Sequence, residues 1–488
     1  MAQIVLITNR AVSQEVYASG NELTYVSLDD RAPGVHRMKH VAFRMGVESK
    51  IIDHFSSLTR EQLIEVIHRH VSKETKIIGF SSTFSGKNFL AVLTPAFFEL
   101  VRSLAHPDLK IVFGGNHPKW EFVPNETLLD NVDYFFKGFA ERAFGILVER
   151  QFHGSTKTLF PSSTMRKAKI IECDKDYRFE EDPANLDYRL AYDDSDFIEP
   201  DEMLTLELSR GCILNCKHCG DAEYNRKASG EYVDIAENLR NVLMNNYQKF
   251  GTTKYSISDS MTNDNVEKLE MMASVISSLP FVPEFFAYVR PDMSISLPES
   301  LGLFAEAGFV SMAMSFGSFV PENRRLAARI MHTDRAIDVI VKINQLAKTP
   351  IGMTTGLVAG LPFDTKETLQ ENQKQLVELV RDNPNLTVIW SPHVLTPFGS
   401  FDYQVNAEMY GYVKSPQGWV NGTTGLTESY VRGLIKEFNI ELLSIRQEML
   451  TNVNYLKFKG PCDLNKFKEI ATNEAARKER YIAKLLTR

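Results

Sequence analysis

Short apolar runs alternate with amphipathic stretches along most of the chain. In the first third these runs are three to five residues long, which is typical of strands buried on both faces of a parallel sheet. Helical patterns separate several of them, and Thr59–Gln62 has the form of a capping box that begins one helix. This alternation predicts crossover connections and a parallel sheet. The predicted strands are Ile4–Thr8, Lys50–Asp53, Ile77–Phe80, Ile111–Phe113 and Val132–Phe136.

The same alternation begins again at Met203 and continues to Ser391. Six strand–helix units predict a partial parallel barrel, because a complete barrel of eight units needs about 250 residues and this region spans roughly 190. From Phe401 the pattern changes to loops and helices. The predicted strands are Met203–Leu208, Lys254–Ser258, Glu284–Val289, Phe309–Ser315, Ile351–Val358 and Leu386–Ser391. The predicted helices are Asp234–Lys249, Asp264–Ser278, Thr333–Lys348 and Thr365–Arg381.

A strongly acidic stretch separates the two alternating regions. Between Glu172 and Glu202 there are 13 acidic and 3 basic residues, with two prolines and no clear periodicity, which indicates a linker. The end of the chain is basic, with 9 basic and 4 acidic residues from Lys457 to Arg488, and has a helical pattern over Leu464–Leu486. The predicted division is a Rossmann-like sheet domain over 1–152, an acidic linker over 153–202, a partial barrel over 203–400 and a mostly helical capping and substrate segment over 401–488.

Composition narrows the class of protein. The 488 residues are enough for roughly three domains. Five cysteines exclude a disulfide scaffold, no apolar run reaches the ~18 residues of a membrane span, and the first residues show no secretory pattern, so a cytoplasmic protein is expected. The net charge of −7 argues against a nucleic-acid coat protein. The basic tail leaves a phosphate-bearing substrate or a nucleic acid open, with a solvated helix face as the alternative.

Three of the five cysteines lie in one loop directly after the first strand of the second region. Cys212, Cys216 and Cys219 form the pattern C-x3-C-x2-C, and three thiolates on so short a loop can converge on one metal centre. An iron–sulfur cubane takes cysteine ligands at such spacings, and three ligands leave one iron open to another group. A zinc site with His218 or Asp221 as the fourth ligand is the alternative.

From about Met203 to Phe401, with the cysteine loop as its most specific mark, the sequence resembles the radical S-adenosylmethionine (radical SAM) superfamily. The resemblance implies a [4Fe-4S] cluster whose open iron binds the amino and carboxylate groups of SAM. It also implies reductive cleavage of SAM to a 5′-deoxyadenosyl radical that abstracts hydrogen from an unactivated position. The protein then mainly binds, orients and shields, while the cofactor supplies the chemistry.

The resemblance extends to strand ends that would hold SAM. It places His218 near the adenine and Asp259 at the end of the second strand, and Arg290 after the third strand can pair with the SAM carboxylate. Taken singly, Asp259 also fits a helix cap and Arg290 an ordinary ion pair. Gly317 stands where relatives commonly carry a glutamate, which weakens a ribose contact at that place. The remaining cofactor positions, from the fourth and fifth strands, are Ser315, Gly356, Gly360 and Leu361.

The first domain, Met1 to about Phe152, resembles the cobalamin-binding domain that precedes many radical SAM barrels. The likeness lies in Gly34-Val35-His36 and in small residues at the later strand ends, where backbone can approach a ligand closely. No D-x-H-x-x-G motif is present, so a vestigial domain with ordinary turn glycines is the alternative. His36 and His117 are candidate cobalt ligands or structural histidines. The residues expected to line cobalamin are Ser81, Ser82, Thr83, Gly114, Gly115, Gly138 and Glu141.

The resemblance supports two functional hypotheses, and a third comes from another class. The first is a cobalamin-dependent methyltransferase acting on an unactivated carbon. The second keeps the radical but ends in rearrangement, oxidation or cyclisation, and the third is a zinc-binding interaction protein. The first two imply a small-molecule or modified-metabolite substrate and a one-electron reductant such as flavodoxin or ferredoxin. Tyr288 and Cys462 are weak candidates for catalytic residues, Cys462 either as a hydrogen-atom donor or as a buried apolar residue.

Overall fold

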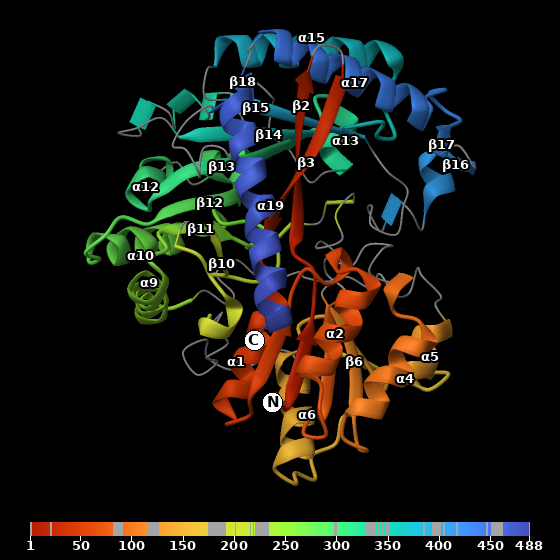
Figure 1. Cartoon of the computed structure of the whole chain (residues 1–488). Helices are drawn as coiled ribbons and strands as arrows, with labels where there is room; N and C mark the ends of the chain where they lie inside the picture. The colour runs from red at the N-terminus through yellow and green to blue at the C-terminus, as the bar shows by residue number, and fades with distance from the viewer. Residues whose placement is uncertain are drawn as a thin grey trace. The chain divides into compact units, whose positions relative to one another are not determined.

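The computed structural model of the chain divides into two compact units (Figure 1). The first consists of Met1–Ser13, Leu28–Thr205 and Thr472–Arg488, and the second of Gln14–Ser27 and Leu206–Ala471. The segment 401–488, expected to form one capping segment, is thus divided between the units. The structure describes residues 2–487 except 20–21, 82–90, 116–125, 174–191, 201, 215, 218, 220–233, 297–299, 327–337, 340, 343–344, 347–350, 384–385, 393–401, 404–405, 416–417, 446–447 and 450–461.

The first unit is built on a seven-stranded sheet with the order β4-β1-β5-β6-β7-β9-β8. Neighbouring strands are parallel except β8 and β9, which confirms the parallel sheet predicted from the alternating pattern. The capping box predicted at Thr59–Gln62 is present at the start of α2. The elements are β1 (Ile4–Ile7), α1 (Pro33–Arg44), β4 (Ser49–Ile52), η1 (Phe55–Ser57), α2 (Arg60–His70), β5 (Ile77–Ser81), α4 (Pro95–Leu104), β6 (Lys110–Gly115), α5 (Glu126–Asn131), β7 (Tyr134–Lys137), α6 (Glu141–Phe152), β8 (Ser163–Met165), β9 (Ala168–Glu172), η2 (Asp194–Asp196) and most of α19 (Leu464–Thr487).

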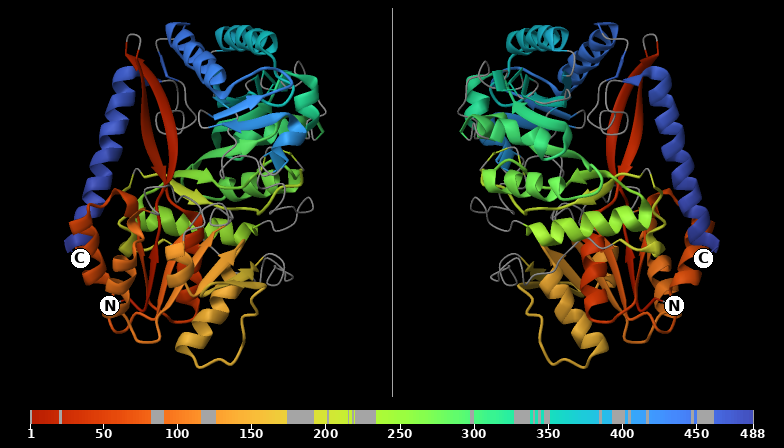
Figure 2. Two further views of the ribbon diagram at one scale, coloured as in Figure 1. Left: turned by 90° about the vertical axis from the view of Figure 1, so that its right-hand side faces the viewer. Right: turned by 90° about the vertical axis from the view of Figure 1, so that its left-hand side faces the viewer.

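Helices cover both faces of this sheet (Figure 2). Along β1, Ile4 and Leu6 lie in the core on one face, with residues of α1 and α6. Val5 and Ile7 lie in the core on the other face, with residues of α2, α4 and α19. A strand buried on both faces therefore needs a continuous apolar run, which is why β1 and β5 could be predicted from sequence.

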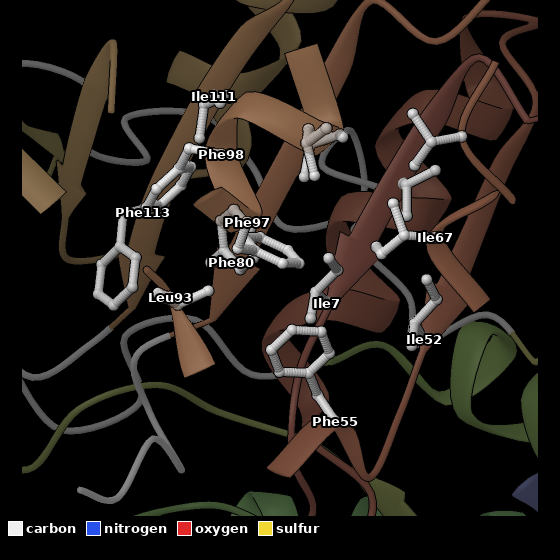
Figure 3. Packing of buried hydrophobic residues seen from close by; sticks show 14 of the residues in the cluster. Ile7, Ile52, Phe55, Ile67, Phe80, Leu93, Phe97, Phe98, Ile111 and Phe113 are labelled. Carbon is white, nitrogen blue, oxygen red and sulfur yellow. The ribbon is translucent and has the colours of Figure 1, made fainter. Parts of the chain in front are cut away.

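Aromatic rings fill the second of these cores (Figure 3). The ring of Phe80 lies 6.1–6.5 Å from those of Phe55, Phe97, Phe98 and Phe113, measured between centroids. Burial of each such side chain stabilises the fold by about 1.5–3 kcal/mol relative to exposure. Phe80 of β5 thus joins α4 to η1 and β6.

The basic tail is not simply a solvated helix. Tyr481, Ile482 and Leu485 of α19 belong to the buried core of the first unit. Two arginines of the tail, Arg477 and Arg480, bind the carboxylate of Glu199 at 3.4 and 2.6 Å. Its apolar positions therefore attach α19 to the first unit, and part of its positive charge is neutralised within that unit.

Part of the expected acidic linker also belongs to the first unit, because β8 and β9 extend the sheet beyond β7. The carboxylate of Asp196 lies 2.9 Å from the ammonium of Lys39, and Glu202 binds two buried arginines. A run of acidic residues predicts an exposed segment, since an unpaired buried charge is costly. Here the partners come from distant parts of the chain, so the pairing is not visible in the sequence.

The second unit contains a six-stranded sheet whose order, β10 to β15, follows the chain. The strands from β11 to β15 pair in parallel, as expected for a partial barrel, and all six predicted strands form. The predicted helix Thr333–Lys348 lies largely outside the described residues. The elements are β10 (Leu204–Leu206), α9 (Ala236–Phe250), β11 (Lys254–Ile257), α10 (Val266–Ser277), β12 (Glu284–Val289), α11 (Pro291–Ser296), α12 (Ser300–Glu306), β13 (Phe309–Gly317), α13 (Pro321–Leu326), β14 (Gly352–Ala359), α15 (Lys366–Asp382) and β15 (Leu386–Pro392).

Several strands were not expected from the sequence. β2 (Ala11–Ser19) and β3 (Glu22–Asp30) pair with each other, and the dipeptide Gly20-Asn21 between them is the sequence signal that could have predicted a hairpin. The region after Phe401, expected to be helical, also holds two short strand pairs. Among the described residues no helix is both long and apolar enough to cross a membrane. The elements of this last region are η3 (Ala407–Tyr410), β16 (Tyr412–Ser415), β17 (Gly418–Asn421), α17 (Glu428–Ile445), β18 (Glu448–Met449) and β19 (Cys462–Asp463).

Candidate functional site

The cysteine loop begins directly after β10, at the carboxyl end of the first strand of the six-stranded sheet. Cys216 is buried, Cys212 and Cys219 are half-buried, and none of the three forms a disulfide. The N–H of Cys219 donates to the carbonyl oxygen of Cys216 at 3.1 Å, and the N–H of Lys217 donates to the carbonyl oxygen of Leu326 at 2.9 Å. These contacts tie the middle of the loop to its own turn and to the end of α13.

A cluster and a single zinc ion make different demands on the three thiols. In a [4Fe-4S] cluster each cysteine binds a different iron, whereas the sulfur ligands of one zinc all lie about 2.3 Å from it. Among the residues that the structure describes, no three His, Cys, Asp or Glu side chains are placed to hold one ion. His218 and Asp221, the fourth ligands of the zinc alternative, lie outside the described residues.

Arg290 lies against the cysteine loop. It follows β12, its side chain is buried, and its Nη1 is 3.5 Å from Sγ of Cys216. The backbone of Arg290 is held by the side chain of Asn263, whose Oδ1 accepts the Arg290 N–H at 2.9 Å and whose Nδ2 donates to the Arg290 carbonyl oxygen at 2.8 Å. Two hydrogen bonds to Asn263 thus fix the backbone of the residue whose guanidinium contacts Cys216.

Asp259 at the end of β11 is buried and bonded to the first residues of the cysteine loop. Its Oδ1 accepts the N–H groups of Leu208 and Ser209 at 2.8 and 3.1 Å, and its Oδ2 accepts the hydroxyl of Ser209 at 2.7 Å. The helix-cap alternative for Asp259 is wrong, because Asn265 caps α10 by accepting the N–H of Lys268. The carboxylate instead joins the ends of the first two barrel strands.

Register places further predicted residues side by side along the barrel strands. Ser315 on β13 is opposite Gly356 on β14, and Tyr288 on β12 is opposite Ala313 on β13. Ser315 thus lies two residues further toward the carboxyl end of β13 than Ala313. The side chain of Tyr288 is 53% exposed although its neighbours in the strand are buried. The ring of Tyr288 is therefore open to solvent, unlike the other side chains of β12.

The predicted Gly360–Leu361 segment follows β14 and is folded around a carboxylate that sequence reasoning missed. Oδ2 of Asp364 accepts the N–H groups of Gly360 and Leu361 at 2.8 and 2.9 Å, and Oδ1 accepts Nδ2 of Asn323 at 2.7 Å. Burial raises the pKa of Asp364 to about 7, although these three donors lower it. The amide groups of Gly360 and Leu361 are therefore used to shape the turn.

Trp419 and Tyr412 pack against the same turn. The hydroxyl of Tyr412 donates to the carbonyl oxygen of Gly360 at 2.7 Å, and the ring of Trp419 lies so close that a Cβ on Gly360 would be 2.6 Å from its Cη2. Trp419 is a core residue with 2% exposure. β16 and β17 thus support the loop after β14.

A buried tyrosine lies near the cysteine loop as well. Burial raises the pKa of Tyr403, and the charges of Tyr410, Asp402, Asp364 and Cys216 raise it further, so that its phenol stays protonated. The ring centroids of Tyr403 and Tyr410 are 4.5 Å apart, and the hydroxyl of Tyr410 donates to Asp402. The proximity of Cys216 and Tyr403 joins residues nearly 190 positions apart, and no local pattern in the sequence indicates it.

The candidate cobalamin residues of the first unit lie along one sheet edge. Register pairs Ser81 with Gly114 and Gly115 with Lys137, one residue before Gly138, so the ends of β5, β6 and β7 are adjacent. Gly115 and Gly138 have φ values of +155° and +92°, which favour glycine. The strand order reverses between β1 and β5, and such a switch point is where open α/β sheets bind ligands.

The other candidates of the first unit are only partly described. Glu141 is buried at the start of α6, while Ser82, Thr83 and His117 lie outside the described residues. His36 is buried with its ring 4.5 Å from that of Tyr192, and burial lowers its pKa to about 4. Cys462 pairs with Met449 in a short strand, and its side chain is not among those described.

Ion pairs occupy the same sheet edge after β1 and β4. The guanidinium of Arg10 lies 2.8 Å from Asp53 and 2.9 Å from Glu202, and Arg31 lies 2.8 Å from Glu202. Burial raises the pKa of Glu202, but the charges of Arg31 and Arg10 lower it more, so the pKa lies well below its usual range. This edge is thus filled by the chain itself beside β1 and β4, whereas glycines border β6 and β7.

Comparison with known proteins identifies the class of the second unit. Residues 206–376 match the sequence model of the Radical SAM superfamily, so this part of the chain is a radical SAM domain. The matched segment begins at Leu206 and contains the three cysteines of the loop and Arg290. No curated protein matches the sequence.

Solved structures extend the likeness to most of the chain. The radical S-adenosylmethionine methyltransferase TsrM from Kitasatospora setae, with cobalamin and a [4Fe-4S] cluster bound, is similar with a TM-score of 0.62 and 14% identity over 86% of this chain and 80% of TsrM. TsrM with tryptophan substrate and the SAM analogue aza-SAM gives a TM-score of 0.61 and 15% identity, over 84% and 77%.

A second enzyme has the same fold. The cobalamin-dependent S-adenosylmethionine radical enzyme OxsB with aqua-cobalamin bound has a TM-score of 0.54 and 13% identity, over 84% of this chain and 56% of OxsB. At such low identity the likeness defines the fold: a parallel α/β sheet domain, a radical SAM barrel and a helical C-terminal region. The fold class predicted from the sequence is confirmed.

Proposed function

We propose that this chain is a radical SAM enzyme, and specifically a cobalamin-dependent methyltransferase that acts on an unactivated carbon. The proposal is carried by the loop of Cys212, Cys216 and Cys219 at the carboxyl end of the first barrel strand, inside the segment that matches the radical SAM superfamily. The fold shared with TsrM and OxsB, which bind cobalamin, supports the second part.

The three cysteines are the residues that would hold a [4Fe-4S] cluster, and such a cluster supplies the electron that cleaves SAM at its open iron. Arg290 offsets the negative charge of the Cys216 thiolate and is long enough to pair with the carboxylate of SAM as well. Ser315 and Gly356, adjacent in the sheet, offer small surfaces for the nucleoside. The exposed ring of Tyr288 then borders the substrate and excludes water from it.

In the first unit, we assign cobalamin to the edge formed by β5, β6 and β7. Ser81, Gly114, Gly115 and Gly138 place only small side chains there, so a flat macrocycle can contact the backbone. The ion pairs of Arg10 and Glu202 occupy the edge after β1 and β4 and leave the later strand ends to the ligand. We expect an external one-electron donor such as flavodoxin or ferredoxin to reduce the cluster.

The cluster is tested by anaerobic purification and reconstitution with iron and sulfide. We expect iron–sulfur absorbance and formation of 5′-deoxyadenosine from SAM under reducing conditions. Cys216→Ala should abolish both. Cys173→Ala is the matched control, because Cys173 is also buried but directly follows β9 in the first unit. A colourless protein that contains zinc, or product formation by Cys216→Ala, would contradict the assignment.

Methyl transfer and cobalamin binding need separate readouts. Cobalamin should remain with the protein after desalting, and the labelled methyl group of SAM should appear in the product. If 5′-deoxyadenosine forms but no label is transferred, the enzyme carries out a rearrangement, oxidation or cyclisation. If cobalamin is lost on desalting, and added cobalamin changes the rate of neither 5′-deoxyadenosine formation nor methyl transfer, the first unit has kept the fold without the cofactor.

A further inference from the structure

A buried network of charges lies behind the cysteine loop. Lys268, in the first turn of α10, has a fully buried side chain, and its Nζ is 2.7 Å from Asp264 and 3.3 Å from Asp259. The same ammonium donates to the hydroxyl of Ser209 at 3.0 Å and to the carbonyl oxygen of Met261 at 3.3 Å. A buried ammonium is costly unless it is paired and hydrogen-bonded, and here four oxygen atoms surround it.

Asp259 connects this network to the cysteine loop. Both of its oxygens are used on the residues that precede the loop: Oδ1 by the N–H groups of Leu208 and Ser209, and Oδ2 by the hydroxyl of Ser209 and by Lys268. Ser209 stands three residues before Cys212. Hydrogen bonds from backbone N–H to a carboxylate are short and strong, so they fix the direction in which the chain leaves β10.

The same connection between β11 and α10 also holds the other side of the cysteine loop. Asn263 bonds to both the N–H and the carbonyl oxygen of Arg290, and its Nδ2 also donates to Ser294 Oγ at 2.9 Å. The guanidinium of Arg290 reaches Cys216. The segment Asp259–Asp264 therefore contacts the chain before Cys212 and the residue that faces Cys216, while Lys268 pairs with both of its carboxylates.

We propose that Asp259 and Lys268 are positioning residues that arrange the cysteine loop before any cluster is present. A preformed site loses less conformational entropy on binding than a mobile loop does, so the network raises the affinity of the loop for the cluster and fixes the cluster environment. The identity of the cluster rests on the proposed function, but the rigidity of the loop is a property of the chain without it.

The chain contains a closely matched control for this network. Lys39 of α1 is also a buried lysine that contacts two aspartates and one serine: its Nζ lies 2.8 Å from Asp193, 2.9 Å from Asp196 and 3.0 Å from Ser195. It belongs to the first unit, whereas Lys268 belongs to the second. Lys39→Met therefore removes the same kind of network without touching the cysteine loop.

The experiment compares Lys268→Met, Lys39→Met and wild type. In cluster-free protein, hydrogen exchange of the amides over residues 206–219 should be about tenfold faster in Lys268→Met only. After anaerobic reconstitution, Lys268→Met should hold about half the iron of wild type or less and lose it several-fold faster to a chelator. Its reduced cluster should show an altered electron paramagnetic resonance spectrum in the presence of SAM. Lys39→Met should match wild type in all four measurements.

Milder variants keep the proposal testable if Lys268→Met does not fold. Asp259→Asn preserves the side-chain size, and Ser209→Ala removes one hydroxyl; each should speed amide exchange and iron loss in the same direction. If these variants fold, and their amide hydrogen exchange and iron retention equal those of wild type, the positioning role is wrong. A wild-type chain that takes up no iron, while the variants still loosen the loop, would overturn the proposed function and support the positioning role.

Discussion

Replacing Gly360 by alanine should destabilise the second unit by about 2–5 kcal/mol, the total of two separate costs. Gly360 has a φ of +87°, and the left-handed region costs a residue with a Cβ about 1–2 kcal/mol. The new Cβ would also lie 2.6 and 2.7 Å from Cη2 and Cζ2 of Trp419. Forcing an extra carbon into a packed core typically costs about 1–3 kcal/mol, and Trp419 is too deeply buried to move away freely.

The two costs can be measured separately. Gly425→Ala is the control for backbone strain, because Gly425 has a φ of +72° and no atom within 4 Å of its Cβ position; it should lose only about 1–2 kcal/mol. Phenylalanine lacks the two Trp419 atoms that clash, so Gly360→Ala combined with Trp419→Phe should be more stable than the sum of the single changes by about 1–3 kcal/mol. Denaturant unfolding followed by circular dichroism gives all four values.

A loss below about 1 kcal/mol in Gly360→Ala, or strict additivity in the double variant, would refute the reasoning. Equal losses in Gly360→Ala and Gly425→Ala would show that only the backbone conformation matters at this turn. Because Gly360 is one of the residues that the sequence predicts near SAM, the affinity for SAM should fall together with stability in Gly360→Ala. Gly425→Ala should leave that affinity unchanged.

Three further predictions concern charges. Glu202→Gln leaves Arg10 and Arg31 buried against a neutral amide and should cost the first unit about 3–5 kcal/mol in denaturant unfolding. The pKa of Glu202 is lower in the folded chain than in the unfolded chain. The free energy of unfolding of wild type should therefore decrease as pH falls below 4.5, and that of Glu202→Gln should not show this decrease. Asp364 behaves oppositely, because burial raises its pKa from 3.8 to about 7. The thermal midpoint of wild type should therefore fall as pH rises between these values. If the difference in thermal midpoint between wild type and Asp364→Asn does not change with pH, this prediction is wrong. Arg290→Met should lower the reduction potential of the cluster in a redox titration, because a positive charge beside Cys216 favours the more negative, reduced state. Arg290→Lys keeps the positive charge, so its reduction potential should lie close to that of wild type.

Much of the site could be predicted because its residues stand directly after strands. The spacing of Cys212, Cys216 and Cys219 is local, and a loop that follows a barrel strand lies at the carboxyl edge of the sheet whatever the rest of the chain does. Arg290 was found for the same reason. Asp364, Tyr403 and the network of Lys268 were missed, because their partners are brought to them by packing and no short pattern indicates which carboxylate or phenol will be buried.

The sequence by itself determined five strands of the first sheet, all six strands of the second sheet and the cysteine loop. These depend on apolar runs and on spacings of a few residues, which local chemistry decides. Only the tertiary structure decided which charged residues are buried in ion pairs. The acidic run before the barrel was expected to be a linker, yet Asp196 and Glu202 bind buried cations of the first unit. The physical reason is that burial of a charge depends on whether a partner of opposite sign meets it, and Glu202 meets Arg10 and Arg31 from more than 170 residues away.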